Sequence, residues 1–372
     1  MHLSATFSIA CALAFAWLGD VRAVVAPVAL AWGVVVLATR APAGPAWAWA
    51  LAVRLPLLLV APTLSDDVWR YVWEGEVWAA GANPFVHAPD DPALAQLRDE
   101  VWANVNHRHV PTVYPPLAQA LFFALAPGGV LAWRVFATAC DVATAHLLAR
   151  RDPRAGATWA LLPLPAMESA ISGHLEGPGV MLMVLALGGS DAAAWAAAMI
   201  KLLPGVLLAR ARRPFVWALA TAIVCAPVIR LDGLRTYGEK WAYNASLFAL
   251  VPSRPLLGAV GAAIVAWILW RSRDRARVAL WATGAFVLLS PVVHPWYVLW
   301  PLAAALWNGM RAWAVLAATS PFAYVVLATY DPATSTWEEP TWARLVVYVP
   351  FYAALVVEAW RRLTRAGPSP VH

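Results

Sequence analysis

The sequence predicts an all-α membrane protein, a polytopic bundle of about twelve transmembrane helices forming a single domain over residues 1–372. Its 372 residues are 62% hydrophobic and only 13% charged, whereas soluble domains average roughly 45–50% apolar and about 25% charged residues. Apolar stretches of about 14–20 residues follow one another along the whole chain. The net charge of +6 arises in short connecting segments. Because a soluble chain needs polar residues over most of its outside, and no basic face is formed, this composition excludes a water-soluble enzyme, a disordered scaffold and a nucleic-acid-binding domain.

The N-terminal stretch 3–18 lacks the basic start of a signal peptide, and further apolar stretches follow at once, so we interpret it as the first span. Twelve apolar stretches approach the length that crosses a bilayer. They are residues 3–18, 23–39, 46–62, 131–149, 155–171, 177–189, 215–230, 256–270, 278–292, 297–310, 312–329 and 345–361. The three cysteines lie within apolar stretches without paired spacing, which predicts neither a disulfide nor a metal site.

Arginine clusters set the expected orientation, because short cytoplasmic loops collect basic residues. Four clusters must then share the cytoplasmic side: Arg150, Arg151 and Arg154; Arg210, Arg212 and Arg213; Arg271, Arg273, Arg275 and Arg277; and Arg361, Arg362 and Arg365. Two apolar segments must then not cross the membrane. Residues 115–127 are short and begin with two prolines, so we expect a helix on the outer membrane surface. Residues 192–209 are interrupted by Lys201 and Pro204, so we expect a re-entrant pair of half-helices broken near Pro204.

This topology places the unusual polar residues on the extracytoplasmic side. The first outer loop, residues 63–128, begins with Ser65, Asp66 and Asp67, and Ser65 is a good helix N-cap. The pattern that follows predicts an amphipathic surface helix with two carboxylates at its start. On one interpretation the carboxylates only complement the helix dipole, which would make them poor bases. On the other, they remove a proton from a sugar hydroxyl at the membrane surface. The composition of the loop leaves both open.

Other outer turns carry a few polar groups each. His174 and Glu176 lie in one turn, where a hydrogen-bonded turn is the alternative to a site. His294 lies beside Tyr297 in another turn, where an interfacial aromatic belt is the alternative. The loop 231–255 contains Lys240 among several cationic groups, enough to neutralise a phosphate, although surface solvation explains them equally well.

Ionisable residues also occur within the expected spans. They are Arg54, Arg134, Asp141, His146, Glu168, Lys201 and Glu358. Charges at membrane depth are costly, so they are usually paired or functional. Arg134 and Asp141 are two helical turns apart, so each needs partners from other helices. Structural pairing and ion or proton transport both account for them, although no internal repeat typical of the commonest transporters is visible.

Five segments together resemble the bacterial polytopic GT-C glycosyltransferases, most closely mannosyltransferases that use a polyprenyl-phosphate sugar. In the family's order, they are SDDVWRYVWEGEVWAAGANPF at 65–85, PTVYPPLAQALFFAL at 111–125, SGHLEGPGV at 172–180, IKLLPGVLL at 200–208 and SPVVHPWYVLWPL at 290–302. The first segment and the Tyr-Pro-Pro helix after it are the most specific. Trp69, Trp73 and Glu176 depart from residues common in relatives, which bears on the substrate more than on the reaction class.

The resemblance implies an inverting transfer of a hexose, with mannose the first expectation, from a polyprenyl-phosphate donor to a cell-envelope glycan or glycolipid. It implies Asp66 as general base, with Asp67 orienting the acceptor or a positive group. The expected substrate-binding residues are Arg70, Tyr114, His174, Glu176, Lys240, His294 and Tyr297. A divalent cation is a possible cofactor, because Asp66, Asp67, His174 and Glu176 could converge on one rim.

The expected partners are therefore the lipid-linked sugar, the acceptor and the bilayer, with no nucleic acid. The expected location is the bacterial plasma membrane, with multiple spans and the active site facing outward. The alternative function is a polytopic transporter or lipid-linked-sugar flippase without transferase activity. A non-catalytic membrane scaffold also fits the composition but leaves the order of the motifs unexplained.

Overall fold

A computed structural model describes residues 3–226, 230, 232–233, 235, 242–329 and 338–365 of the chain. The described residues form helices and no β-strand; a single isolated bridge joins Tyr243 to Val292. The α-helices are α1 (Leu3–Leu18), α2 (Val25–Ala38), α3 (Ala46–Leu57), α4 (Asp67–Ala79), α5 (Glu100–Ala103), α6 (Pro116–Leu125), α7 (Gly129–Arg151), α8 (Pro153–Leu161), α9 (Pro163–Ala170), α10 (Glu176–Leu187), α11 (Asp191–Ile200), α12 (Pro214–Cys225), α14 (Arg254–Arg271), α15 (Arg275–Leu289), α16 (Leu299–Trp307), α17 (Ala312–Thr319) and α18 (Thr341–Arg365). Short 3-10 helices connect them: η1 (Pro92–Leu97), η2 (Ala126–Gly128), η3 (Leu203–Arg210), η4 (Leu247–Ala249), η5 (Pro295–Val298) and η6 (Ser320–Ala328).

Helices occupy each of the twelve expected apolar stretches, but they differ in length. Among the described residues, three helical segments are long and apolar enough to cross a membrane by themselves: Pro116–Arg151, Arg254–Arg271 and Thr341–Thr364. Several other apolar helices have only 10–17 residues. The all-helical class is therefore confirmed for the described part of the chain, whereas the count of twelve spans stays a prediction.

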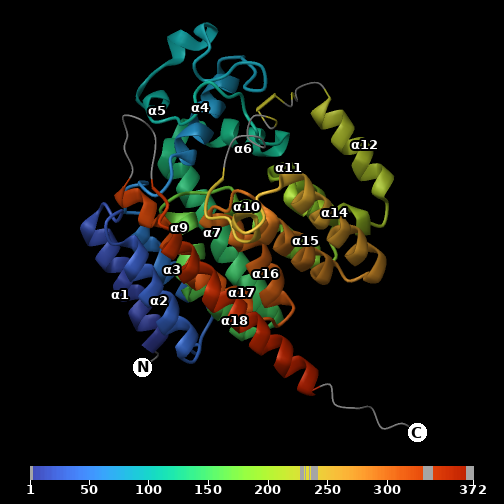
Figure 1. The fold of residues 1–372 in the computed structure, drawn as a ribbon. Helices are drawn as coiled ribbons and strands as arrows, with labels where there is room; N and C mark the ends of the chain where they lie inside the picture. Colours follow the sequence, from blue (N-terminus) through green and yellow to red (C-terminus); the bar gives the residue numbers. More distant parts are fainter. Residues whose placement is uncertain are drawn as a thin grey trace.

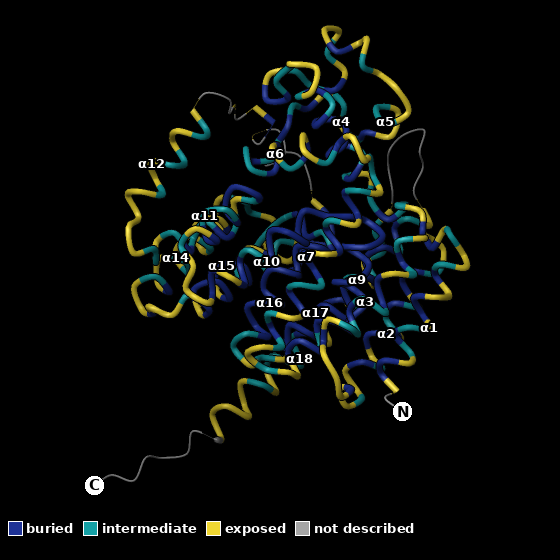
Figure 2. The backbone as a smooth tube through the Cα atoms, turned by 180° about the vertical axis from the view of Figure 1, so that it is seen from behind, coloured by how far each residue is buried: buried dark blue, intermediate teal, exposed yellow. Residues whose placement is uncertain are grey.

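The core of the bundle runs through α9, α10, α16 and α17, where most residues are buried, and α7 contributes one buried face (Figure 2). The helices α1, α2 and α3 pack on one side of this core, and α14 and α15 lie on the other (Figure 1). Large apolar side chains remain exposed on the outer helices, for example Phe215 on α12 and Trp270 on α14. Such an apolar exterior suits a lipid environment, because lipid tails impose no penalty on exposed apolar surface.

The buried ions within the bundle are paired by side chains and carbonyl groups of other helices. The Arg54 guanidinium on α3 forms an ion pair with Asp141 on α7, and Trp159 Nε1 donates to Asp141 at 2.8 Å. Arg134 donates to the carbonyl oxygens of Val60 at 2.7 Å and Ala170 at 2.6 Å. These contacts compensate the cost of burying the three charges inside the bundle. Arg54, Arg134 and Asp141 therefore stabilise the packing of the helices.

Helix α11 and the 3-10 helix η3 form a hairpin that reverses the chain. The turn comes at Lys201 and Leu202, a little earlier than the expected break near Pro204, which instead lies in the first turn of η3. Arg275 pairs with Asp191 at the start of α11 and also donates to the carbonyl oxygen of Arg210 at 2.9 Å. The two arginine clusters around 210 and 275 therefore lie at the same end of the bundle, and Lys201 lies at the other end of the hairpin.

The lobe formed by α4, α5 and α6 caps the opposite end of the bundle (Figure 1). The expected surface helices differ from the observed ones in two respects. Helix α6 continues through η2 into α7 as one helical segment. Helix α4 is half buried and packs so closely on α6 that a β-carbon on Gly75 would lie 2.3 Å from the carbonyl oxygen of Phe122.

The face of α4 that carries Arg70 and Glu74 is buried, although the sequence pattern predicts an amphipathic helix on the membrane surface. Arg70 Nε donates to Glu74 Oε1 at 2.8 Å, and Glu74 Oε2 accepts from Thr112 at 2.7 Å and from Gln119 at 2.6 Å. Every charge in this group has a partner, so its burial is tolerated. The network ties α4 to α6 and to the loop that precedes it.

Candidate functional site

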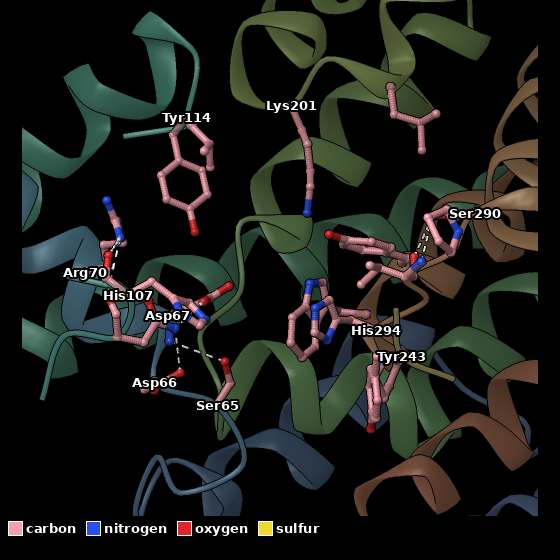
Figure 3. Close-up of a pocket in the computed structure, with 18 of the residues that line it drawn as sticks. Ser65, Asp66, Asp67, Arg70, His107, Tyr114, Lys201, Tyr243, Ser290 and His294 are labelled. Carbon is pink, nitrogen blue, oxygen red and sulfur yellow. Dashed lines mark hydrogen bonds between the residues drawn. The ribbon is translucent and has the colours of Figure 1, made fainter. Parts of the chain in front are cut away.

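A cavity of about 1840 Å³ lies between the α4–α6 lobe and the helical bundle. Its polar walls come from the start of α4, the loop 103–110, the turn of the α11–η3 hairpin and the segment around η5. In Figure 3, Asp66 and Asp67 lie on one side of the cavity, His294 and Tyr243 on the other, and Lys201 points into the space between them. The cavity thus brings together residues that are more than 200 positions apart in the sequence.

Asp66 and Asp67 stand at the entry to α4. The observed N-cap is Asp66 and not Ser65, yet the Asp66 side chain makes no capping hydrogen bond. Ser65 Oγ instead accepts from the backbone N–H of Asp67 at 3.3 Å. The side-chain amide of Asn106 donates to Asp66 Oδ1 at 2.7 Å and to Asp67 Oδ1 at 3.3 Å. The acid pair is therefore held toward the cavity and is not consumed by helix capping.

The surroundings of Asp66 suit a general base. Its side chain is exposed to the cavity, but the enclosing protein desolvates it, and the charge of Asp67 adds to this effect. Together they raise the pKa of Asp66 from 3.8 to about 6, against the lowering effect of the Asn106 hydrogen bond. A base is most effective when its pKa lies near the working pH. The shift is opposite to the one that helix capping would produce.

Lys201 is the cation that reaches the cavity from the α11–η3 hairpin. Its ammonium forms an ion pair with Glu176 and lies 4.6 Å from the ring centroid of Tyr297. The Lys201 side chain is 26% exposed, whereas that of Glu176 is only 1% exposed. Glu176 Oε1 also accepts from Trp300 Nε1 at 3.2 Å. Glu176 therefore lies behind the cavity wall, where it orients and partly neutralises Lys201.

His294 lies on the far wall within a stack of rings. Its imidazole lies parallel to Trp296, with ring centroids 4.3 Å apart, and edge-on to Tyr297 at 5.4 Å. Burial lowers the pKa of His294 to about 3, so the ring is neutral at physiological pH. A neutral imidazole offers one N–H donor and one acceptor to a ligand in the cavity.

His174 lies below the cavity floor on the other face of Trp296, with ring centroids 3.8 Å apart. Its Nδ1 is 2.8 Å from Glu168 Oε2, and its Nε2 is 3.1 Å from Ser65 Oγ and 3.8 Å from Asp67 Oδ2. His174 is fully buried. It therefore contacts the acid pair from beneath and does not line the cavity.

Arg70 and Tyr114 both reach the cavity, in different ways. The Arg70 guanidinium donates to the carbonyl oxygens of Asn106 at 3.3 Å and Val110, so it shapes the loop that carries Asn106. The Tyr114 ring packs edge-on against Tyr71 at 5.2 Å, and its hydroxyl points toward the cavity in Figure 3. Burial and the charge of Asp67 raise the pKa of Tyr114 well above 10, so its hydroxyl remains a neutral donor.

The expected site residues therefore fall into three groups. Six line the cavity: Asp66, Asp67, Arg70, Tyr114, His294 and Tyr297. His174 and Glu176 lie behind its wall, and Lys240 falls outside the described residues. Within the described part of the chain, no group of three or more His, Cys, Asp or Glu side chains is arranged to hold a metal ion. In particular, Glu176 pairs with Lys201 and does not join the acid pair.

Sequence reasoning missed three residues that the site contains. Lys201 was assigned to the interior of the bundle, although the family-like segment at 200–208 includes it. Asn106 had no signal in the sequence, because an asparagine in a polar loop is unremarkable. Glu168 was noted as a buried ion, but its partner His174 could not be identified without the structure.

The cavity continues into an apolar arm between η3, α14 and α15. The side chains along this arm are aliphatic or small, with one aromatic ring: Leu202, Leu203, Val206, Leu257, Gly258, Gly261, Ala262, Val265, Ala282, Ala285, Phe286 and Leu289. A polar chamber joined to an apolar arm fits an amphiphilic ligand, with its polar group beside the acid pair and its hydrocarbon tail along α14 and α15.

Residues 241–360 match the family model described as the MptB C-terminal domain. The matched segment contains α14, α15 and the η5 turn, and thus the α14–α15 side of the apolar arm and the His294 wall, whereas the η3 side of the arm lies outside it. The acid pair and Lys201 lie outside it. No curated protein matches the chain, and no solved structure matches it. The match covers less than half of the chain, so the similarity to this family is limited to residues 241–360, and the apolar helices are those of a multi-pass membrane protein.

Proposed function

We propose that the protein is a membrane glycosyltransferase that moves a hexose from a polyprenyl-phosphate donor to a hydroxyl group of a cell-envelope glycan or glycolipid. The single observation that carries this proposal is the cavity itself. It combines a carboxylate whose pKa is about 6 with a lysine, and it continues into an apolar arm. A base, a cation for a leaving phosphate and a groove for a lipid tail are the three parts that such a transfer requires.

The reaction is proposed as one displacement at the anomeric carbon. The acceptor oxygen forms a bond to that carbon, and Asp66 accepts the proton of the acceptor hydroxyl. The bond between the anomeric carbon and the phosphate oxygen breaks, and polyprenyl phosphate leaves with the electron pair. Because attack and departure occur on opposite faces, the configuration inverts. Asp67 orients the acceptor or a positive group beside Asp66.

Lys201 is assigned to the departing phosphate. Its ammonium lies in the cavity wall, across the chamber from the acid pair, and an ammonium placed where charge develops stabilises the transition state (Figure 3). His294 adds the N–H of a neutral imidazole on the same side as Tyr297. Separate positions for the base and the cation allow one sugar ring to lie between them.

The comparison supports the proposed sugar, and the topology supports the proposed location. MptB is a mannosyltransferase of the GT-C type, which makes mannose the first hexose to test. The arginine clusters around 210 and 275 lie together at the end of the bundle away from the α4–α6 lobe. With those arginines in the cytoplasm, the cavity faces the extracytoplasmic side of the plasma membrane.

A transporter or lipid-linked-sugar flippase is the alternative. It was suggested by Arg134, Asp141, Glu168 and Lys201. In the structure Asp141 pairs with Arg54, and Arg134 binds backbone carbonyls. Glu168 binds Tyr324 and His174, and Lys201 pairs with Glu176. Of these four residues, Arg134, Asp141 and Glu168 do not line the cavity, whereas Lys201 does. The observations therefore favour transfer chemistry over a path for ions.

The test is transfer from radiolabelled polyprenyl-phosphate mannose in nanodiscs, with membrane glycan extracts as acceptor. We expect product from the wild-type protein and none from Asp66→Asn. The matched control is Asp90→Asn, which makes the same change at an exposed position of the same loop. Full activity in Asp66→Asn would refute the base. Movement of the lipid-linked sugar across liposomes without any glycosidic product would favour the flippase. The same transfer assay with EDTA added tests whether the activity requires a divalent cation.

A further inference from the structure

A buried chain of hydrogen bonds leads from the interior of the bundle to the acid pair. The Tyr324 hydroxyl on η6 donates to Glu168 Oε1 at 2.7 Å, and Glu168 Oε2 is 2.8 Å from His174 Nδ1. His174 Nε2 then lies 3.1 Å from Ser65 Oγ. The side chains of Glu168 and His174 are completely buried. These hydrogen bonds use both carboxylate oxygens of Glu168 and both ring nitrogens of His174. The series therefore runs without a gap from Tyr324 to Ser65.

The backbone and the aromatic rings hold His174 rigidly in this chain. Its backbone N–H donates to the carbonyl oxygen of Glu168 at 2.8 Å. Gly173 adopts a φ of +67°, which favours glycine, and its carbonyl oxygen accepts from Trp133 Nε1. Trp296 stacks on the imidazole. The ring therefore cannot turn away from Asp67 without breaking several contacts.

His174 and the acid pair lie among a crowded set of titratable groups. Those that face the acid pair and His174 come from every surrounding element: Asp66 and Asp67 at α4, Arg70 and Tyr71 on α4, His107 in the loop 103–110, Tyr114 before α6, Glu168 on α9, Glu176 at the start of α10, Lys201 after α11, His294 before η5 and Tyr324 on η6. Within this set, Glu168 is the anion in direct contact with His174. A positive His174 lowers the pKa of Asp66, against desolvation and the charge of Asp67.

We propose that Glu168 and His174 are positioning residues that keep the Asp66–Asp67 pair ionised. The Glu168 carboxylate accepts from Nδ1–H and stabilises the imidazolium form of His174. The imidazolium Nε2–H donates to Ser65 Oγ, and its charge lies next to Asp67. This inference rests on the proposed function, because the ionised pair is the form that accepts the proton of the acceptor. Neither Glu168 nor His174 touches the substrate in this arrangement.

The experiment measures the protonation of Asp66 directly. A hydrophobic carbodiimide reacts with a protonated carboxyl group, so the pH dependence of its adduct on Asp66 reports the protonated fraction. The wild-type protein in nanodiscs is treated over pH 4–9, and fragment ions locate the adduct. We expect a midpoint near pH 6. In Glu168→Gln it should rise by roughly one pH unit, because an opposite charge close to a carboxylate favours its ionised form.

Three further variants separate this effect from loss of structure. His174→Gln should raise the midpoint as Glu168→Gln does, and it keeps the test valid if Glu168→Gln does not fold. Glu168→Asp retains the negative charge, so its labelling midpoint should lie much closer to the wild-type value than that of Glu168→Gln. Ser169→Ala is the matched control: its hydroxyl is buried on the same helix and bonds the carbonyl oxygen of Pro165, so the midpoint should stay at the wild-type value.

The outcomes distinguish this inference from the proposed function. Unchanged midpoints in both Glu168→Gln and His174→Gln would overturn the inference, even if transfer is observed. An upward shift in these variants, with the wild-type midpoint retained in Ser169→Ala, supports it. Such a shift without any transfer activity would refute the proposed function alone, because the labelling does not require turnover.

Discussion

Replacing Lys201 with methionine separates the structural role of this side chain from its proposed catalytic one. Methionine is unbranched and keeps most of the length of the side chain, and it removes the charge. Glu176, whose side chain is only 1% exposed, then loses its cation and retains only the indole N–H of Trp300. Removing one partner of a buried ion pair costs about 3–5 kcal/mol, and we take the lower end, about 3 kcal/mol, because Lys201 is partly exposed to the cavity.

The double variant Lys201→Met with Glu176→Gln removes both charges. Because no unpaired carboxylate remains, we expect its stability to return to within about 1 kcal/mol of the wild type. Its activity should not return. The departing phosphate would still lack its cation, and losing one such group costs roughly 10²–10³-fold in kcat. The single variant Glu176→Gln keeps Lys201 and should retain most of the activity.

Two assays read these effects independently. SDS titration in mixed micelles, followed by tryptophan fluorescence, measures the free energy of unfolding, and transfer from polyprenyl-phosphate mannose measures kcat. A single Lys201→Met variant as stable as the wild type would show that the ion pair with Glu176 contributes nothing. A double variant with normal kcat would refute the assignment of Lys201 to the leaving phosphate.

Further predictions concern the acid pair and the core. Transfer should rise with pH through a half-point near 6, because Asp66 must be ionised and its pKa is about 6; a kcat/KM profile that is flat from pH 5 to 8 would contradict this. Asn106→Ala should move this acidic limb up by ~0.5–1 pH unit, because its amide stabilises the ionised pair. Asn104→Ala, whose amide donates to a backbone carbonyl oxygen, should leave the limb in place. Arg54→Met should destabilise the fold by roughly 3–5 kcal/mol in SDS titration, and Arg54→Met with Asp141→Leu should recover most of it; equal stability of the single variant and the wild type would refute the pairing.

The helical class and the positions of the helices could be predicted from the sequence, because both depend on local composition. An apolar stretch in a lipid environment must satisfy its own backbone hydrogen bonds, and a helix does so within one segment. The acid pair could also be identified from local composition. Two adjacent carboxylates next to an apolar stretch stand out, wherever the rest of the chain folds.

The burial of the polar face of α4 could not be predicted in this way. Arg70 and Glu74 have helical spacing on the polar side of the predicted surface helix. Thr112 and Gln119, from a later segment, supply hydrogen-bond partners that allow this side to be buried. From the sequence, Lys201 is predicted only to interrupt the apolar segment 192–209. The turn of the α11–η3 hairpin places it in the cavity, where it meets Tyr297. Both outcomes depend on contacts that no local pattern records.

The sequence predicted a helical membrane protein and drew attention to Asp66 and Asp67 at the start of its first long loop. It did not predict which polar groups meet, because that depends on the tertiary structure. The tertiary structure raised the pKa of Asp66 by enclosing it, paired Glu176 with Lys201, and joined His174 to both Glu168 and the acid pair. The physical reason is that hydropathy is a property of one segment, whereas desolvation and ion pairing depend on which distant segments pack together.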